Sequence, residues 1–161
     1  MVATRSNARQ THRMANKDNP GAGKRFELAV QKFLQETQNL NLKRPFAVNI
    51  GTNEKKRPHL FDLGSEEHAT VVECKAHSWT AGGNSPSAKL AVWNEAMYYF
   101  SLTPNSYRKL FFVKLSLKRD VSLFKHYVGR FSHLIPVDLE IWEFNEITGH
   151  GECKYRNAHE S

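Results

Sequence analysis

Two short apolar segments, residues 59–64 and 69–77, are separated only by the polar sequence SEEH. This pattern predicts a β-hairpin, because apolar runs of about four to eight residues on either side of a short polar turn tend to pair as antiparallel strands. A hairpin in the middle of the chain needs further strands or helices to cover its apolar faces. The fold must therefore contain a β-sheet with covering layers.

Both segments nevertheless contain charged residues at positions where a buried strand normally has Val or Ile. Asp62 interrupts the first segment, and Glu73 and Lys75 interrupt the second. Burying an unpaired charge is costly, so such residues are usually paired, metal-bound or functional. Side chains two positions apart on a strand share a face, which places Glu73 and Lys75 together and Cys74 on the opposite face, as a small core residue. Asp62 can lie across the hairpin, so the sequence predicts two carboxylates and an ammonium group in one pocket.

The order of the remaining segments predicts an α/β fold. Helical spacing or helix-start signals mark three helices, and apolar runs mark five strands. The expected helices are residues 19–37, 87–103 and 119–135, the last with Asp120 as its N-cap, and the expected strands are residues 44–51, 59–64, 69–77, 107–117 and 138–147. This order predicts a mixed central β-sheet flanked by helices on both faces.

The chain of 161 residues is long enough for one domain with a proper hydrophobic core. Residues 1–19 are polar and basic and are predicted to be a disordered arm, followed by a folded domain over residues 20–148 and a polar C-terminal tail over residues 149–161. No segment approaches the roughly 20 apolar residues of a membrane span, and no secretory signal is recognisable. Two cysteines cannot form a disulfide framework. We therefore expect a cytoplasmic protein without a membrane partner.

The formal net charge of +7 predicts attraction to a polyanion, through neutralisation of phosphates and release of their counterions. One basic cluster, Lys55, Lys56 and Arg57, directly precedes the predicted hairpin. Charge alone does not distinguish nucleic acid from anionic lipid, and it indicates no chemistry.

The charged residues of the hairpin fit the hydrolysis of a phosphodiester. Two carboxylates that lie close together repel each other, and a divalent cation relieves that repulsion. Mg²⁺ is typically bound by one or two carboxylates together with water and phosphate oxygens, and it activates water for attack on phosphorus. A nearby lysine adds a positive charge that holds the phosphate or the water. A structural ion-pair cluster of Asp62, Glu73 and Lys75 is the alternative that the spacing leaves open.

The sequences PHLFDLG and VVECKA, with Asp62 and Glu73 eleven positions apart, resemble the bipartite Asp…Glu-x-Lys motif of the PD-(D/E)xK nuclease superfamily. The upstream sequence GKRFELAVQKFLQE is similar to the first helix of that family, as in Mrr-type restriction enzymes and archaeal Holliday-junction resolvases. The predicted α-β-β-β-α-β order is also the order of the family's core. The resemblance covers residues 20–116. It departs from the motif at the proline, because Pro58 stands four positions before Asp62, and many members likewise lack the adjacent proline.

This resemblance implies a restriction-endonuclease-like core and a DNA endonuclease of restriction, junction-resolving or homing type that depends on Mg²⁺, or on Mn²⁺ in its place. It implies that Asp62 and Glu73 bind the metal and that Lys75 is the catalytic lysine. Glu27 would be the auxiliary acid of the first helix, although a glutamate near a helix N-terminus is also favoured by the helix dipole. Cleavage of both DNA strands would imply a homodimer.

Further residues are candidates for contact with DNA. The loop SWTAGGNSPS, residues 78–87, offers Trp79 as a stacking face and Asn84 as a hydrogen-bonding group for base edges. His77 lies two positions beyond Lys75, and Lys89 begins the second helix. Burial of Trp79 against that helix, and solvation of His77 and Lys89, are the structural alternatives. The candidates for contact with nucleic acid are thus Lys55, Lys56, Arg57, His77, Trp79, Asn84 and Lys89.

Two other functions stay open at this point. One is a non-catalytic DNA-binding module on a nuclease-like scaffold, against which the complete Asp/Glu/Lys set argues. The other is a basic scaffold protein that binds RNA or an acidic partner.

Overall fold

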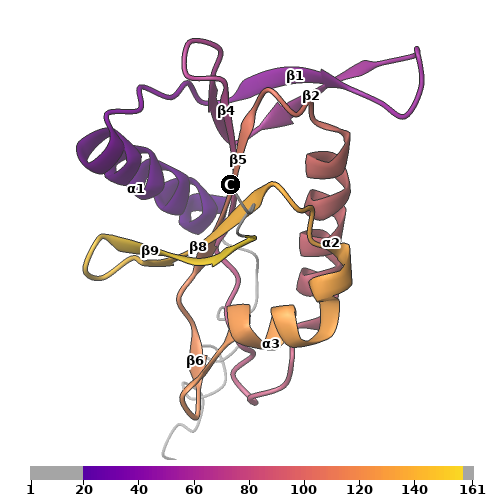
Figure 1. Ribbon diagram of the computed structural model, residues 1–161. Helices are drawn as coiled ribbons and strands as arrows, with labels where there is room; N and C mark the ends of the chain where they lie inside the picture. Colours follow the sequence, from indigo (N-terminus) through magenta and orange to yellow (C-terminus); the bar gives the residue numbers. More distant parts are fainter. Residues whose placement is uncertain (1–19, 158–161) are drawn as a thin grey trace, which may run out of the picture.

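A computed structural model describes residues 20–157, which form a mixed α/β fold around a five-stranded sheet (Figure 1). The sheet has the strand order β3-β4-β5-β8-β9; its three central strands are parallel, and the two outer strands are antiparallel to their neighbours. The expected basic arm, residues 1–19, lies outside the described residues. The helices and strands are α1 (Pro20–Gln38), β1 (Phe46–Ile50), β2 (Arg57–Phe61), β3 (Leu63–Ser65), β4 (Thr70–Lys75), α2 (Ser87–Leu102), β5 (Arg108–Lys114), β6 (Leu117–Lys118), β7 (Val121–Ser122), α3 (Leu123–Phe131), the short 3-10 helix η1 (Ser132–Leu134), β8 (Leu139–Asn145) and β9 (His150–Arg156).

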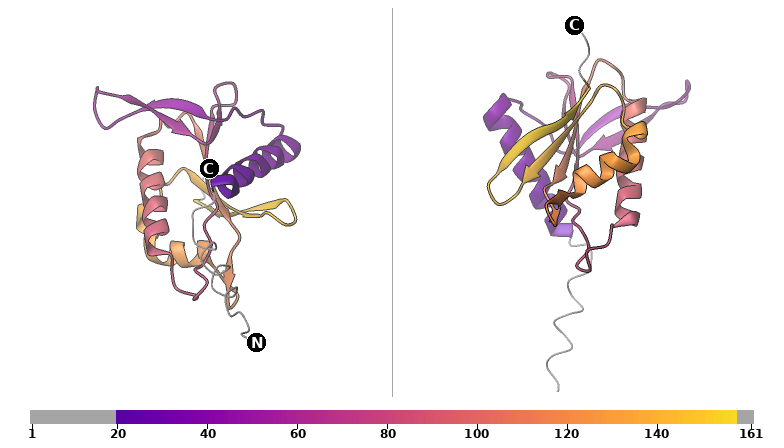
Figure 2. Two further views of the ribbon diagram at one scale, coloured as in Figure 1. Left: turned by 180° about the vertical axis from the view of Figure 1, so that it is seen from behind. Right: turned by 60° about the horizontal axis from the view of Figure 1, so that its bottom comes forward.

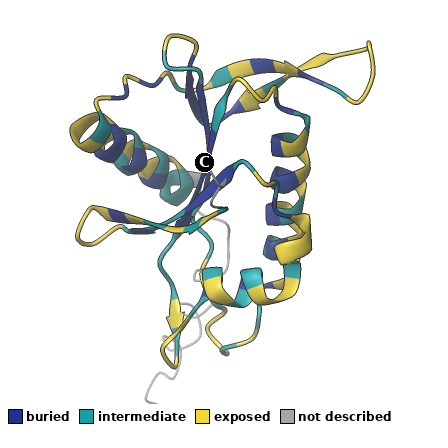
Figure 3. Cartoon of the chain, in the orientation of Figure 1, coloured by how far each residue is buried: buried dark blue, intermediate teal, exposed yellow. Residues whose placement is uncertain are grey.

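Helices cover both faces of the sheet, as the sequence predicts. Helix α1 lies on one side, and α2 and α3 lie on the other (Figures 1 and 2). The alternation of side chains along β4 explains this arrangement: Val72 and Cys74 pack in the core under α1, whereas Val71 packs in the core under α2. The central strand β5 is buried along residues 110–113 because helices cover it on both faces (Figure 3).

The predicted strand 59–64 is divided at Asp62 into β2 and β3, and the two parts have different partners. Strand β2 pairs with β1, with Phe61 opposite Phe46, whereas β3 pairs with β4, with Leu63 opposite Val72. The predicted hairpin between residues 59–64 and 69–77 is therefore confirmed only for the short segment after Asp62. Among the described residues, β4 has no strand partner on this side beyond Val72, so the sheet opens where the charged residues of β4 begin.

The predicted helix over residues 119–135 starts later than expected. Arg119 and Asp120 have φ angles of 48° and 65° and form the turn between β6 and β7, as in a two-residue hairpin loop. Helix α3 begins after Ser122, whose side-chain oxygen accepts a hydrogen bond from the amide of Lys125 at 3.0 Å. The assignment of Asp120 as the N-cap is wrong because Asp and Ser are both good N-cap residues, and the turn occupies the first of the two candidates.

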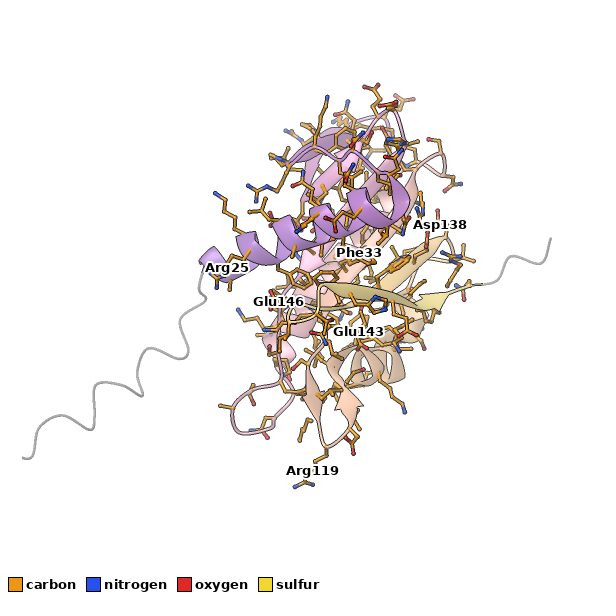
Figure 4. The ribbon with its side chains drawn as sticks, turned by 90° about the vertical axis from the view of Figure 1, so that its left-hand side faces the viewer. Arg25, Phe33, Arg119, Asp138, Glu143 and Glu146 are labelled. Carbon is orange, nitrogen blue, oxygen red and sulfur yellow. The ribbon has the colours of Figure 1, made fainter. Side chains whose placement is uncertain are left out.

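The polar tail expected from residue 149 is wrong for residues 150–156, which form the edge strand β9. Its apolar residues are few: Tyr155 packs against the core under α2, and Gly151 lies so close to α1 that a Cβ there would be 3.0 Å from Phe33. Phe33 is labelled in Figure 4. The other positions include exposed charged side chains, which protect a sheet edge from pairing with another chain. Among residues 20–157, no helix combines the length and the apolar character of a bilayer-spanning segment.

Candidate functional site

Asp62, Glu73 and Lys75 line one pocket of about 220 Å³, at the place where β3 ends its pairing with β4. The sequence predicts this convergence, but the position of the pocket follows from the division of the strand at Asp62. The opposite wall comes from α2, and the remaining lining residues are His59, Leu60, Val92, Glu95, Ala96 and Tyr99.

The Asp62 carboxylate takes the place of a strand partner. Its Oδ2 atom accepts a hydrogen bond from the backbone amide of Cys74 at 2.8 Å, just beyond the last β3–β4 pair. Burial and the nearby charge of Glu73 raise the pKa of Asp62 to about 8, against the lowering effects of the Cys74 amide and Lys75. The carboxyl group therefore keeps its proton at neutral pH unless a cation enters the pocket.

Both carboxylate oxygens of Glu73 face nitrogen atoms. This side chain is 7% exposed; its Oε1 lies 3.2 Å from Nε2 of His59, and its Oε2 lies 3.5 Å from Nζ of Lys75. The His59 ring is held in place by stacking on Tyr99, with ring centroids 4.0 Å apart, and by an edge contact with Phe61 at 4.7 Å. Glu73 thus has a defined orientation towards the pocket.

The sequence patterns did not indicate His59, Glu95 or Tyr99 as site residues. His59 approaches Glu73 only because the chain bends at Asp62, and no local pattern reports that bend. Glu95 and Tyr99 lie one turn apart on α2, and the Tyr99 hydroxyl donates a hydrogen bond to Oε1 of Glu95 at 2.9 Å. This hydrogen bond is the main cause of a raised Tyr99 pKa. The available signal was two polar groups spaced i, i+4 beside the buried face of a helix.

Glu27, the expected auxiliary acid, does not line the pocket. Its Oε2 accepts a hydrogen bond from Nη1 of Arg44 at 3.2 Å, and both side chains are about one quarter exposed. Its charge still contributes to the raised pKa of Asp62, after burial and the larger effect of Glu73. Glu27 therefore lies near enough to Asp62 to act on it electrostatically, with Arg44 as its own ion-pair partner.

Cys74 has the environment expected of a core residue. It is 8% exposed, and burial followed by the charges of Asp62 and Glu73 raises the pKa of its thiol well above the ordinary value. The prediction of a small core residue is confirmed.

The basic cluster at residues 55–57 lies on the β1–β2 hairpin, next to this pocket. Lys55 and Arg57 line a neighbouring groove, and His59 and Tyr99 line both the groove and the pocket. The third member, Lys56, directs its Nζ to the carbonyl oxygen of Gly51 at 3.2 Å.

The other four candidates for nucleic-acid contact are not among the residues that line the pocket. His77 accepts a hydrogen bond at Nδ1 from the indole nitrogen of Trp93, at 2.8 Å. Lys89 lies in the first turn of α2, and Asn84 is exposed in the loop that precedes this helix. Lys89 and Asn84 therefore lie at the start of α2, whereas His77 contacts its middle, next to the pocket-lining Val92.

Trp79 packs at the edge of the core under α2, beside the β6–β7 hairpin and α3. Its indole nitrogen donates a hydrogen bond to the carbonyl of Val121 at 3.2 Å, its ring lies 4.9 Å from that of His126, and Nζ of Lys118 is 5.3 Å from its centroid. These three contacts come from the β6–β7 hairpin and α3. The loop of residues 78–87 is therefore attached to the β6–β7 hairpin and α3 through Trp79, near its start.

Asp62 and Glu73 have the donor chemistry for a magnesium ion. Within residues 20–157, no group of three or more His, Cys, Asp or Glu side chains is arranged to hold a metal ion. Mg²⁺ needs fewer protein ligands than such a group provides, since it keeps several waters and is commonly held by one or two carboxylates. Two neighbouring carboxylates, of which the half-buried Asp62 has a strongly raised pKa, favour the binding of a cation. No protein-family model matches this chain, and neither the curated proteins nor the solved structures include a match.

Proposed function

We propose that this protein is a divalent-metal-dependent DNA endonuclease with Asp62, Glu73 and Lys75 in its active site. The observation that carries the proposal is the convergence of these three side chains in one pocket, with Asp62 bound to the amide that follows Glu73. A raised carboxyl pKa in such a pocket is typical of functional sites.

The residues of the pocket have complementary roles in this proposal. Mg²⁺ bound by Asp62 and Glu73 would lower the pKa of an attacking water and neutralise charge on the phosphate. Lys75 keeps Nζ 3.5 Å from Glu73 and is partly exposed, so its charge can hold a phosphate oxygen or the water. His59 and Tyr99 fix the outer wall and the orientation of Glu73. The net charge of +7 favours a nucleic acid as the substrate.

One observation favours a second candidate, a DNA-binding protein without catalysis. Both oxygens of Glu73 already face nitrogens of His59 and Lys75, as they would in a structural ion-pair cluster. Such a cluster would make Glu73 important for stability and irrelevant to chemistry. The two candidates therefore differ in whether the protein cleaves DNA at all and, if it does, whether cleavage needs the Glu73 charge.

The direct test is incubation of the protein with plasmid DNA, branched DNA and RNA in buffers with Mg²⁺, Mn²⁺, Ca²⁺ or EDTA. We expect cleavage of DNA with Mg²⁺ or Mn²⁺, none with EDTA, and binding without turnover with Ca²⁺. One pocket cleaves one strand at a time, so double-strand breaks should require a homodimer, visible in the oligomeric state of the DNA complex. If DNA stays intact in all reactions with Mg²⁺ or Mn²⁺, the nuclease is rejected and the non-catalytic DNA-binding protein remains as the candidate function.

Replacing Lys55, Lys56 and Arg57 together with alanine should make DNA binding less dependent on salt. If these groups neutralise phosphates, the slope of log affinity against log salt should become shallower by about 0.9 for each phosphate that the variant no longer neutralises. Fluorescence anisotropy titrations of a labelled duplex at several salt concentrations, with EDTA present, measure the slope.

A matched control removes the same charge from α1, which lies on the opposite side of the sheet from α2 (Figure 2). Lys24, Arg25 and Lys32 are exposed there, and their combined replacement with alanine gives the same net charge as the hairpin variant. Equal slopes in the two variants would show that the hairpin is not a specific DNA contact.

A further inference from the structure

A groove of about 410 Å³ separates the β1–β2 hairpin from the last turns of α2. This volume falls within the range of roughly 300–1,000 Å³ that is typical of ligand pockets. Apolar side chains line part of it, namely Ile50 of β1, Pro58 of β2 and Leu102 of α2. Lys55 and Arg57 supply positive charge on the hairpin side, so the groove combines apolar surface with cations.

The groove is continuous with the candidate active site. His59 and Tyr99 line both cavities, and their stacked rings, 4.0 Å apart, form the shared wall. A polymer that places one linkage beside Glu73 and Lys75 can therefore place its neighbouring unit in the groove.

Tyr98 gives the groove an accessible aromatic side chain. It is 55% exposed, whereas the adjacent Tyr99 is engaged by the His59 ring and by Glu95. Lys55 and Arg57 are exposed, and neither forms an ion pair with another residue within 20–157. Aromatic side chains beside cations are the usual means of binding single-stranded nucleic acid, in which the bases stack on the rings and the cations meet the phosphates.

The exposed ring favours an unpaired nucleotide over a base pair. Within a duplex, the neighbouring bases cover both faces of each base, so Tyr98 could not stack on it. The cations alone would suit either form, since both present phosphates.

We propose that this groove binds an unpaired nucleotide of DNA, with its base on Tyr98 and its phosphate at Lys55 and Arg57. The proposal rests on the proposed function for the position of that nucleotide next to the cleaved bond. It follows that the preferred substrate has a single-stranded segment at the cleavage site, as in a flap, a gap or a branched junction.

The test is the binding of a short fluorescein-labelled single-stranded oligonucleotide and of its duplex, measured by anisotropy with EDTA present. Stacking of one base contributes about 1–3 kcal/mol, so Tyr98→Ala should weaken single-strand binding roughly 5- to 150-fold. Tyr98→Phe keeps the ring face and should bind like the wild type. Binding of the duplex should not change in either variant. Because Tyr98 is exposed, circular dichroism melting of Tyr98→Ala should match the wild type.

Single-strand binding by Tyr98→Ala at wild-type strength would overturn the proposal, and so would an equal reduction of single-strand and duplex binding. A cleavage assay separates this result from the proposed function. If the wild type cleaves DNA and Tyr98→Ala binds the single strand as tightly as the wild type, the nucleotide-binding groove is rejected and the proposed nuclease function stands. Tyr98-dependent binding without cleavage of any substrate would support the groove and reject the nuclease.

Discussion

Replacement of Asp62, Glu73 or Lys75 with alanine is expected to abolish Mg²⁺-dependent DNA cleavage while DNA binding survives. Each variant removes a proposed metal ligand or the lysine charge from the place where the phosphate would react, and removal of one such electrostatic group typically lowers turnover by about 10²- to 10³-fold. Binding should persist because most of the affinity comes from phosphate contacts elsewhere on the basic surface. Plasmid nicking and anisotropy, run on the same protein samples, measure the two quantities.

Strand β9 offers a matched control for these variants. Glu152 and Lys154 form an exposed ion pair, with 3.0 Å between Oε2 and Nζ, and they lie outside the pocket. Alanine at either position removes the same kind of charge and should leave nicking unchanged. Full cleavage by any two of the three pocket variants would reject the mechanism and favour the structural ion-pair cluster.

Asp62→Asn is expected to stabilise the metal-free protein, and the gain should increase with pH. Burial raises the pKa of Asp62 from 3.8 to about 8, so the folded protein holds this proton while the unfolded chain has already lost it. The stabilising effect of the protonated carboxyl is complete below the unfolded pKa and is lost as the pH rises to about 8, at up to about 1.4 kcal/mol per pH unit. Asparagine does not titrate, and its side-chain oxygen can still accept the Cys74 hydrogen bond.

Urea unfolding in EDTA, from about pH 5 to about pH 8, measures this effect as the difference in unfolding free energy between Asp62→Asn and wild type. The difference should grow by a few kcal/mol in total, because the titrations of all other groups largely cancel in it. Added Mg²⁺ should make this difference in unfolding free energy smaller, because a cation that binds only the folded wild type stabilises the wild type. A difference that stays constant with pH would show that Asp62 is not the titrating group.

The buried carboxylate of Glu140 is a useful comparison for Asp62, because its surroundings shift its pKa in the opposite direction. Burial by itself would raise the pKa of Glu140. Hydrogen bonds from Arg108 and Arg156 outweigh this effect and lower the pKa. Glu140 is thus a satisfied structural ion pair. Within residues 20–157, the Cys74 amide and the charge of Lys75 lower the Asp62 pKa, and burial outweighs them, so the environment disfavours the ionised form. A bound cation would supply the missing charge, which is what the proposed function requires.

Local patterns in the sequence were sufficient for the layers of the fold and for the three charged residues of the site. Period-two alternation in VVECK assigns Val72 and Cys74 to one face of β4 and Glu73 and Lys75 to the other, and the cores under α1 and α2 follow this division. Helix α2 spans Ser87–Leu102 and stops before Pro104, close to the predicted residues 87–103. These features depend on neighbours along the chain, whose effects are the same in any context.

The tertiary structure decided the features that depend on contacts between distant residues. The bend at Asp62 arises because β2 pairs with β1 while β3 pairs with β4, and only that exchange of partners brings His59 to Glu73. Strand β9 pairs with the free edge of β8, with Gly151 close against Phe33 and Tyr155 packed on the core, although most of its residues are polar. Pairing energy in a sheet comes from backbone hydrogen bonds and cross-strand neighbours, which the residues of a single strand do not specify.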